Sequence, residues 1–384
     1  MRIAFLSNEY PPVTDGIGAY VASMCPGLAA RGHEVHVISC LEGQARSDTV
    51  DRGVHVHRRP FVDVPRGVGR FTGKRPRTTE RLRTAVSAAR TLRELRLQPD
   101  VVEAPDWMAE GLVVALGRTP LVAHLHTPLT LVHEQAELPM GPDQRLADRL
   151  ERWSVARADV VTSPSRLLAD TLRDRGWVRG DVEVVPYPVD LDTWAGLPPV
   201  ASTAPVALVV GRLERRKAPE VVVDACASIP GAEVVLIGRN GEDRDGLPHD
   251  RWLAARAERA GTNVTFAGLV PRDELPQWYG RARVVALAST FDNFPMVGLE
   301  ALAAGRPVVC SDRTGTAELV AGTDAGRVVP VGDVAAMADA LRPYLTDVDA
   351  ASAAGAAARA LAEERCAPEV IAARREAVYR RAIG

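Results

Sequence analysis

A strand-like run, a glycine and two separated cations follow one another in Val209-Val210-Gly211-Arg212-Leu213-Glu214-Arg215-Arg216-Lys217. The apolar residues 206–210 predict a buried strand that ends at Gly211. Arg212 and Lys217 then fall on the connection into the next helix. A guanidinium and an ammonium at the carboxyl end of a parallel strand favour binding of a diphosphate, which a helix N-terminus would assist. The alternative is a pair of solvated charges at a helix start.

On both sides of this segment, short β-branched runs alternate with helical patterns, which is typical of parallel α/β folds. In the second half the predicted strands are Val206–Val210, Glu233–Ile237, Val264–Ala267, Val284–Ala288, Pro307–Cys310 and Arg327–Val329. In the first half they are Ile3–Leu6, Val35–Ser39, Val54–His57, Val101–Glu103, Leu121–His124, Val160–Thr162 and a run near Val182–Val185. Predicted helices include Ala19–Arg31, Glu80–Leu97, Arg145–Ala156 and Ala350–Glu364.

A chain of 384 residues is too long for one ordinary core. We therefore predict an α/β protein of two doubly wound lobes whose strand ends face a cleft. A proline-rich stretch after residue 185 marks the connection between them. The predicted lobes are residues 1–190 and 191–366, and residues 367–384 form a C-terminal helix that packs back towards the first lobe.

Composition excludes several classes of protein. The net charge of −2 gives no reason to expect nucleic acid as a partner. The five cysteines are scattered without a CxxC pair, which argues against a zinc site and against a disulfide framework. The sequence shows no signal peptide and no run of about 18 apolar residues, so we expect a cytoplasmic protein. The sequence carries no indication of an oligomeric state.

A second chemical signal is the stretch from Phe291 to Gly305, on the loop and helix that follow strand 284–288. Its two acids, Asp292 and Glu300, stand roughly 12 Å apart even at about 1.5 Å per residue. Glycosidase carboxyl pairs are about 5–9.5 Å apart. We therefore expect the two acids to bind two different parts of one molecule, each accepting hydrogen bonds from hydroxyl groups. The alternative for each is structural, as a turn residue and as an acid at a helix start.

Three weaker signals lie in the first lobe. Gly16 and Gly18 follow the first strand, where small residues let phosphates approach the backbone, although a plain tight turn would look the same. His124 and His126 alternate at a strand end and so share one face, but no third metal ligand is evident. A single histidine facing the cleft is favoured over a metal site, and a packed core residue is the alternative. Asp190-Leu191-Asp192 imitates a metal-binding motif but lies in the connector and is interpreted as a turn.

Residues 66–96 carry ten Arg or Lys against two acids, and Leu82, Val86, Ala89, Leu92 and Leu95 form an apolar stripe. Such a segment could contact an anionic acceptor or a membrane surface peripherally. An amphipathic surface helix is favoured over membrane contact.

Together these segments resemble family four of the retaining glycosyltransferases over nearly the whole chain, with motifs in the right order. Asn8-Glu9-Tyr10-Pro11-Pro12 before Gly16 is similar to the family's first loop, with Asp15 where a Gly is usual. Gly211-Arg212-Leu213 with Lys217 is similar to its donor-phosphate motif, with Ala218 where a Gly is frequent. Asp292 and Glu300 match its paired-acid motif, with Asp in place of the first Glu.

The resemblance implies a GT-B fold and a set of site residues. Glu300 would hold the nucleotide ribose, and Asp292 would contact the sugar hydroxyls. His126 would reach the sugar across the cleft, and Gly16 and Gly18 would lie near the donor. Backbone groups of Asn293, Phe294, Pro295, Met296 and Val297 would cover sugar and phosphate, and Val270 would border the base.

The predicted function is that of a bacterial, metal-independent enzyme of hexosyltransferase type that needs no cofactor. It would move a sugar from a nucleoside diphosphate sugar, UDP being favoured, to a hydroxyl or amine of a small molecule or glycan. Arg212 and Lys217 would stabilise the leaving diphosphate, with His126 and Asp292 completing the catalytic set. The alternatives are another GT-B enzyme (epimerase, phosphorylase or pseudo-glycosyltransferase) and a non-catalytic two-lobed sugar-binding protein.

Overall fold

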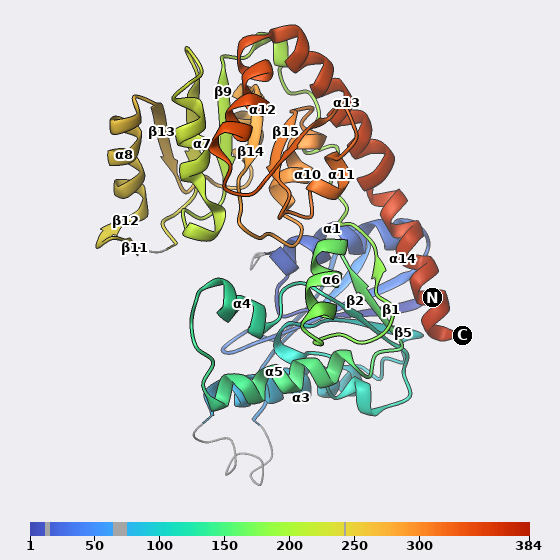
Figure 1. The fold of residues 1–384 in the computed structure, drawn as a ribbon. Coiled ribbons are helices and arrows are strands. Elements are labelled where there is room, and N and C mark those ends of the chain that lie inside the picture. The colour runs from blue at the N-terminus through green and yellow to red at the C-terminus, as the bar shows by residue number, and fades with distance from the viewer. Residues whose placement is uncertain (12–15, 64–74, 242) are drawn as a thin grey trace. The chain divides into compact units, whose positions relative to one another are not determined.

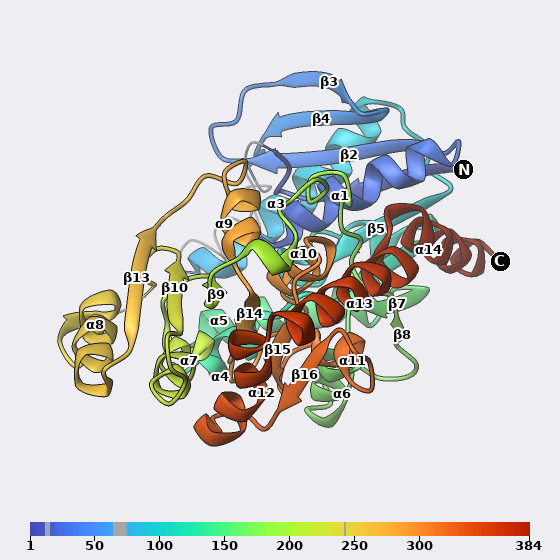
Figure 2. The same cartoon turned by 90° about the horizontal axis from the view of Figure 1, so that it is seen from above.

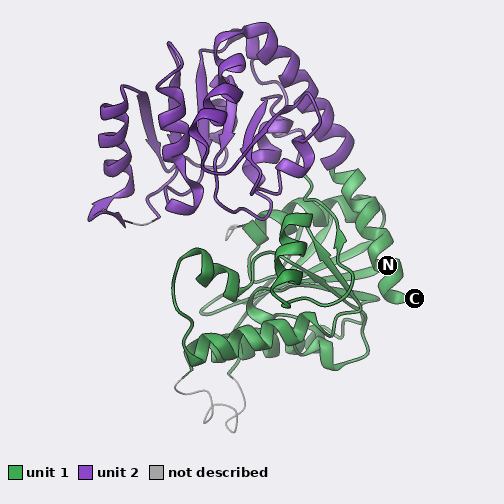
Figure 3. Ribbon diagram, in the orientation of Figure 1, with its two compact units in different colours: residues 1–188, 368–384 green, residues 189–367 purple. Residues whose placement is uncertain are grey.

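The computed structural model describes residues 1–11, 16–63, 75–241 and 243–384. These divide into two compact units (Figure 3). Unit 1 comprises Met1–Pro188 and Pro368–Gly384, and unit 2 comprises Val189–Ala367. Asp15 and residues 66–74 of the basic segment lie outside the described residues.

Within the described residues, the sheet of unit 1 has eight strands in the order β3-β4-β2-β1-β5-β6-β7-β8. The strands are β1 (Arg2–Leu6), β2 (Glu34–Leu41), β3 (Ser47–Asp51), β4 (Val54–Pro60), β5 (Val101–Pro105), β6 (Leu121–His124), β7 (Val160–Ser163) and β8 (Glu183–Val184). Only β3 pairs antiparallel among them. Because β1 pairs with both β2 and β5, the strand order reverses at β1, and the sheet is doubly wound as expected.

Helices cover both faces of this sheet (Figure 1). They are α1 (Gly16–Ala30), α3 (Pro76–Glu94), α4 (Leu129–Gln135), α5 (Pro142–Val155), α6 (Arg166–Asp174) and α14 (Pro368–Ile383), with short 3-10 turns η1 (Trp107–Ala109) and η2 (Val114–Leu116). Helices α3 and α5 contact each other on one face. On the other face α14 contacts α1 and strands β5, β6 and β7 (Figure 2).

The basic helix α3 is rotated relative to the stripe that the sequence suggested. Val86 and Ala89 are only partly buried, whereas Arg81, Ala85 and Ala88 are fully buried. The reason is an ion pair: the Arg81 guanidinium lies 2.9 Å from Glu151 on α5, with both side chains out of solvent. A charged residue can occupy the core-facing side of a helix when a partner neutralises it. The side of α3 that faces the sheet and α5 is therefore the one that carries Arg81, Ala85 and Ala88.

Unit 2 contains, in its described part, a six-stranded parallel sheet with the order β13-β10-β9-β14-β15-β16. The strands are β9 (Val206–Val210), β10 (Glu233–Ile237), β13 (Asn263–Gly268), β14 (Val284–Leu287), β15 (Val308–Ser311) and β16 (Gly326–Val329), and a small hairpin pairs β11 (Asp243–Arg244) with β12 (Leu247–Pro248). All six predicted strands of this half are present, and this unit too is doubly wound, around β9.

The helices of unit 2 pack on both faces of its sheet (Figure 1). They are α7 (Pro219–Cys226), α8 (His249–Ala260), α9 (Leu275–Arg281), α10 (Met296–Ala303), α11 (Ala317–Val320), α12 (Val334–Thr346) and α13 (Val348–Cys366), with 3-10 turns η3 (Val200–Ser202) and η4 (Arg215–Lys217). A core of Val, Leu and Ala side chains from β9, β10, β14, α7 and α12 is almost fully buried. Among the described residues of both units, no helix is long and apolar enough to cross a membrane.

Candidate active site

The two motifs singled out in the second half of the sequence lie side by side at the carboxyl edge of the sheet of unit 2. Strand β9 pairs with β10 on one side and β14 on the other, so the connections after β9 and β14 leave the sheet next to each other. The amide of Thr290 donates to the Arg216 carbonyl at 2.8 Å, and the Arg216 guanidinium donates to the Phe291 carbonyl at 3.2 Å. This edge is the topological switch point, where open α/β sheets bind ligands.

The backbone of the connection that follows β9 is closely packed. Gly211 turns the chain with φ of 145°, and a Cβ on Gly238 would lie 1.9 Å from the Gly211 carbonyl oxygen. Glycine is therefore required at position 238 by space alone. Ala218, where the family frequently has glycine, adopts left-handed φ and ψ of 45° and 46° just before α7. An alanine there costs roughly 1–2 kcal/mol, so the turn after Lys217 is strained.

Lys217 and Asp292, predicted as separate ligands of one molecule, contact each other directly. The Lys217 ammonium donates to the Asp292 carboxylate in a short ion pair. Asp292 is 6% exposed, and its backbone is held by the Arg313 carbonyl and the Gly315 amide. The Arg212 side chain is 52% exposed and lies 3.5 Å from Glu214. The edge thus presents two cations beside a nearly buried carboxylate.

Glu300, on α10, is held by two side chains that the sequence did not indicate. The Tyr279 hydroxyl donates to one of its oxygens at 3.1 Å, and the Arg272 guanidinium lies 3.1 Å from the other. Burial raises the pKa of the Glu300 carboxyl, while Arg272 and the Tyr279 hydrogen bond act in the opposite direction. A 2% exposed carboxylate with two donors is preorganised to accept further hydrogen bonds.

The predicted backbone ligands lie on the loop before α10 (293–295) and in its first turn (296–297). Asn293 accepts a hydrogen bond from the Phe294 amide at 2.8 Å, and Pro295 precedes the first helical residue, Met296. The helix start is pressed against the next loop, because a Cβ on Gly298 would lie 2.4 Å from the Thr316 hydroxyl. Val270, the predicted neighbour of the base, follows β13 and is partly exposed.

In unit 1, His126 follows the end of β6 and is 6% exposed. Its Nδ1 lies 2.7 Å from the Tyr187 hydroxyl, and its amide donates to the Asp106 carboxylate at 2.9 Å. Burial first, and then the charge of Arg375, lower the pKa of His126 to about 3. The ring is therefore neutral at ordinary pH.

Gly16 and Gly18 lie in the first turn of α1, as the positions of a phosphate cradle would require. The amide of Gly18, however, donates to the Glu9 carboxylate at 3.0 Å. An acid of this chain thus lies at the positive end of the helix.

Two buried acids at the switch point of unit 1 were not expected from the sequence. Asp106 follows β5 and is completely buried, and Glu110 is 3% exposed and accepts from the Asn8 amide at 3.2 Å. Between them Met108 and Ala109 have φ of 63° and 51°. Burial raises the pKa of both carboxyl groups to about 8. Strained backbone and perturbed acids together are typical of functional sites.

These acids lead to a prediction for the stability of the protein. A carboxyl group whose pKa is raised in the folded state keeps its proton while the unfolded chain loses it. Folding stability therefore falls as pH rises from the unfolded pKa near 4.5 towards the folded value of about 8. Glu110→Gln removes one group that binds a proton in the folded state but not in the unfolded state. For each pH unit, the unfolding equilibrium constant of wild type should therefore increase by a factor about ten times larger than that of the variant.

Denaturant unfolding of both proteins between about pH 5.5 and 7.5 measures this difference. The amide oxygen of Gln still accepts from the Asn8 amide, so local packing is kept. Parallel stability curves for wild type and variant would show that Glu110 is ionised in the folded protein.

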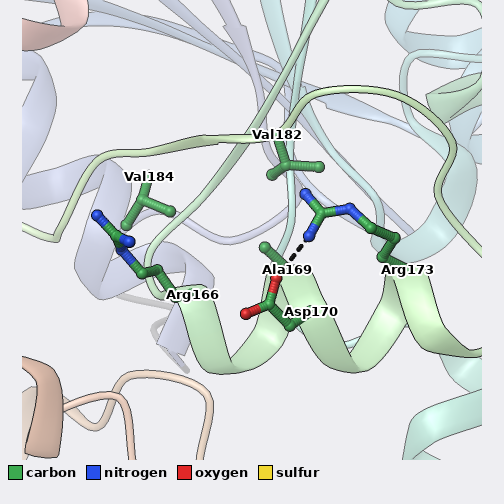
Figure 4. Close-up of a pocket in the computed structure, with 6 residues that line it drawn as sticks. All are labelled: Arg166, Ala169, Asp170, Arg173, Val182 and Val184. Atoms are coloured by element: carbon green, nitrogen blue, oxygen red, sulfur yellow. Dashed lines mark hydrogen bonds and ion pairs between the residues drawn. The ribbon is translucent and has the colours of Figure 1, made fainter.

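The described part of the chain also holds a cavity outside these two edges. Among the described residues, no group of three or more His, Cys, Asp or Glu residues is placed to hold a metal ion. A cavity of about 370 Å³ lies between α6 and β8 and is lined by Arg166, Ala169, Asp170, Arg173, Val182 and Val184 (Figure 4). Asp170 and Arg173, which both belong to α6, pair with each other along one wall of it at 2.5 Å.

Two doubly wound units, each with charged residues gathered at a switch point, define the GT-B class of enzymes. Comparison with known proteins is in accord with that class. Residues 15–188 match the family described as the glycosyl transferase 4-like domain, and residues 197–361 match glycosyl transferases group 1.

The similarity to known proteins covers almost the whole chain. A glycogen synthase of Mycobacterium tuberculosis is 31% identical over 94% of this chain and 89% of its own. A D-inositol 3-phosphate glycosyltransferase of Xylanimonas cellulosilytica is 30% identical over 94% and 92%. Among solved structures, sucrose-phosphate synthase of Thermosynechococcus elongatus aligns with a TM-score of 0.77 at 23% identity, covering 99% of this chain and 98% of that one. Anabaena HepE in complex with UDP-glucose aligns with a TM-score of 0.72 at 20% identity, covering 98% and 99%.

The chain is a glycosyltransferase with the GT-B fold. It belongs to family four of the glycosyltransferases, as the order of its sequence motifs indicated.

Proposed function

We propose that this glycosyltransferase moves a sugar, with retention of anomeric configuration, from a UDP-sugar to a hydroxyl or amine of a small molecule or glycan. The contact between Lys217 and Asp292 carries the proposal. It joins a cation suited to the diphosphate and a carboxylate suited to sugar hydroxyls at one switch point, beside the exposed Arg212. HepE is bound to UDP-glucose in its crystal structure, and we take that donor as the first to test.

The side chains divide the work of donor binding by their chemistry. Arg212 and Lys217 bind the diphosphate oxygens. Negative charge develops on these oxygens as the bond to the sugar breaks, and preorganised cations stabilise that charge. Lys217 turns from Asp292 to the phosphate, which leaves the carboxylate to accept hydrogen bonds from the sugar. Glu300, which is already oriented by Tyr279 and Arg272, accepts from the ribose hydroxyls.

The chemical step proposed is front-face substitution at the anomeric carbon. The bond from that carbon to the diphosphate oxygen breaks, and a bond to the acceptor oxygen or nitrogen forms. The acceptor proton passes to the departing diphosphate. Two cations supply the charge neutralisation, so the reaction is proposed to need no divalent metal ion. His126 contacts the reacting sugar, and unit 1 binds the acceptor.

A thermal-shift screen with UDP, GDP, ADP and dTDP, followed by the corresponding sugars, tests the donor class. A ligand that binds only the folded protein stabilises it by about 2.7 kcal/mol at a hundred times its Kd, which raises the midpoint by several degrees. We expect UDP to give the largest shift, and EDTA to leave it unchanged. Stabilisation by GDP, ADP or dTDP alone would replace UDP as the donor nucleotide, and no shift with any of the four would contradict nucleotide binding.

A further inference from the structure

The C-terminal helix α14 places a cation in the middle of unit 1. Arg375 is 0% exposed, although arginine is among the residues least often fully buried. Its guanidinium lies 3.5 Å from Glu103 on β5 and donates to the Thr162 hydroxyl on β7 at 2.8 Å. A buried charge persists only where ionic and hydrogen-bonding partners compensate the loss of water. The position of Arg375 is therefore specified by the strands beneath it.

The two charges of this pair face different neighbours. Glu103 accepts hydrogen bonds from the hydroxyls of Tyr20 at 2.6 Å and Tyr379 at 2.7 Å. The guanidinium instead approaches Nδ1 of His124 at 3.4 Å. The carboxylate is thus enclosed by tyrosines, while the cation is turned towards the histidines at the end of β6.

Together with burial, this contact keeps His124 neutral; the same Nδ1 also lies 2.8 Å from the Thr162 hydroxyl. A guanidinium only donates hydrogen bonds, so a histidine beside it must offer a lone pair and stay neutral. Burial and Arg375 both lower the pKa of His124, which is completely buried. Its ring meets that of His126 edge-on, with centroids 4.8 Å apart.

The same aromatic cluster encloses His126. The Tyr20 ring lies 5.5 Å from His126 and 4.8 Å from Tyr187, whose hydroxyl contacts His126 Nδ1. The Arg375 guanidinium lies over the Tyr20 ring, 5.6 Å from its centroid. Five described titratable or charged residues act on His126. They are Tyr20 from α1, His124 from β6, Tyr187 from the loop after β8, Arg375 from α14, and Asp106, which accepts from the His126 amide at the end of β5.

We propose that Arg375 is a positioning residue for His126: through His124, Tyr20 and Tyr187 it keeps the imidazole neutral and fixes its orientation. The C-terminal helix is then a part of the reacting site and not only a brace for the sheet. A neutral ring can accept a hydrogen bond from a sugar hydroxyl or donate one to it. An imidazolium could only donate, and it would add a third cation to Arg212 and Lys217. The effect of this role on catalysis rests on the function proposed above, whereas the coupling of Arg375 to His126 does not.

The first measurement follows the ring itself. In protein labelled with ¹⁵N-histidine, and with the signal assigned through His126→Gln, His126 of wild type should remain neutral between about pH 5 and 8. In Arg375→Met/Glu103→Gln, which removes both buried charges together so that neither is left unpaired, the pKa of His126 should rise above its value of about 3, while burial, the larger cause, keeps it below the ordinary histidine value. The titration of the double variant is therefore followed down to about pH 3. Arg375→Lys keeps the charge and should restore the neutral ring.

The second measurement is the pH profile of kcat. The double variant should lose roughly tenfold to a hundredfold in kcat, the cost of a misplaced side chain at a reacting centre, and should gain an acidic limb near the new pKa. Arg375→Lys should lose activity without that limb, because an ammonium does not reproduce the fork of the guanidinium.

Glu376→Gln is the matched control. Glu376 is the next residue along α14 and pairs at 2.6 Å with Arg31, which follows α1, so its loss loosens the docking of the helix. Its histidine neighbour is His33, at 3.7 Å, and no contact joins it to His124 or His126 among the interactions described above. It should leave both the His126 titration and the shape of the pH profile unchanged. An unaltered His126 signal in the folded double variant would overturn the proposal. A shifted His126 with full activity would preserve the coupling and remove His126 from the proposed reaction.

Discussion

Lys217→Ala is expected to slow sugar transfer by about a hundredfold or more, with most of the loss in kcat. The reason is that the ammonium neutralises charge that appears on the diphosphate only as the bond to the sugar breaks. An interaction that strengthens in the transition state affects kcat, whereas one that is equal throughout affects KM. Initial rates with UDP-glucose, or with the donor that the thermal-shift screen selects, measure the effect.

The ion pair with Asp292 complicates this substitution and must be controlled. Removing Lys217 leaves a carboxylate that is 6% exposed without its cation, so some loss could come from the fold and not from the reaction. Lys217→Met/Asp292→Asn removes both charges and tests this, and unfolding midpoints should be compared first. Arg259→Ala on α8 removes an exposed cation elsewhere in unit 2 and should leave transfer intact. Near-normal turnover in a folded Lys217→Ala protein would exclude Lys217 from the site.

The parallel strands could be predicted because burial on both faces makes them continuous apolar runs. Leu121–His124 and Val284–Leu287 are read directly from such runs. Strand β3 could not be predicted, because its residues Ser47–Asp51 are mostly exposed at the edge of the sheet and show no apolar pattern. The rotation of α3 was hidden for a similar reason, since a buried Arg81 contradicts the rule that charges mark the solvent face.

Some residues of the candidate site could be predicted from the sequence and others could not. Lys217 and Asp292 are 75 residues apart, and the sequence placed each of them after its own strand. Only the family resemblance assigned both to one donor molecule, and the shared carboxyl edge of their parallel strands explains why they meet. Tyr279 and Arg272, the partners of Glu300, come from α9 and the segment before it, and no periodicity indicates which helical residue faces a given carboxylate. Glu103 did leave a signal, as an acid inside an apolar strand, but its partner Arg375 lies 272 residues away on another element.

Glu300→Gln is expected to weaken binding of the nucleoside diphosphate by about tenfold to a hundredfold. Hydrogen bonds to a charged acceptor contribute about 1.5–3 kcal/mol each, and every 1.4 kcal/mol is a factor of ten in Kd. Gln keeps the shape of the side chain and an oxygen for Tyr279, so the loss reports the charge. Glu300→Ala should cost more, because it also leaves the Tyr279 hydroxyl in a buried site without its acceptor. Calorimetric titration of UDP into each protein gives the two affinities.

The ribose assignment is decided by removing the hydroxyls from the ligand as well as the carboxylate from the protein. If Glu300 accepts from the ribose, the deoxy form of UDP that lacks the contacted hydroxyl should bind wild type and Glu300→Gln almost equally, while UDP itself separates them. The coupling in this cycle isolates the contact from general effects of the substitution on the fold. An equal loss with UDP and with both its 2′-deoxy and 3′-deoxy forms would mean that Glu300 acts through Arg272 or through the start of α10. An unchanged affinity for UDP would remove Glu300 from the donor site altogether.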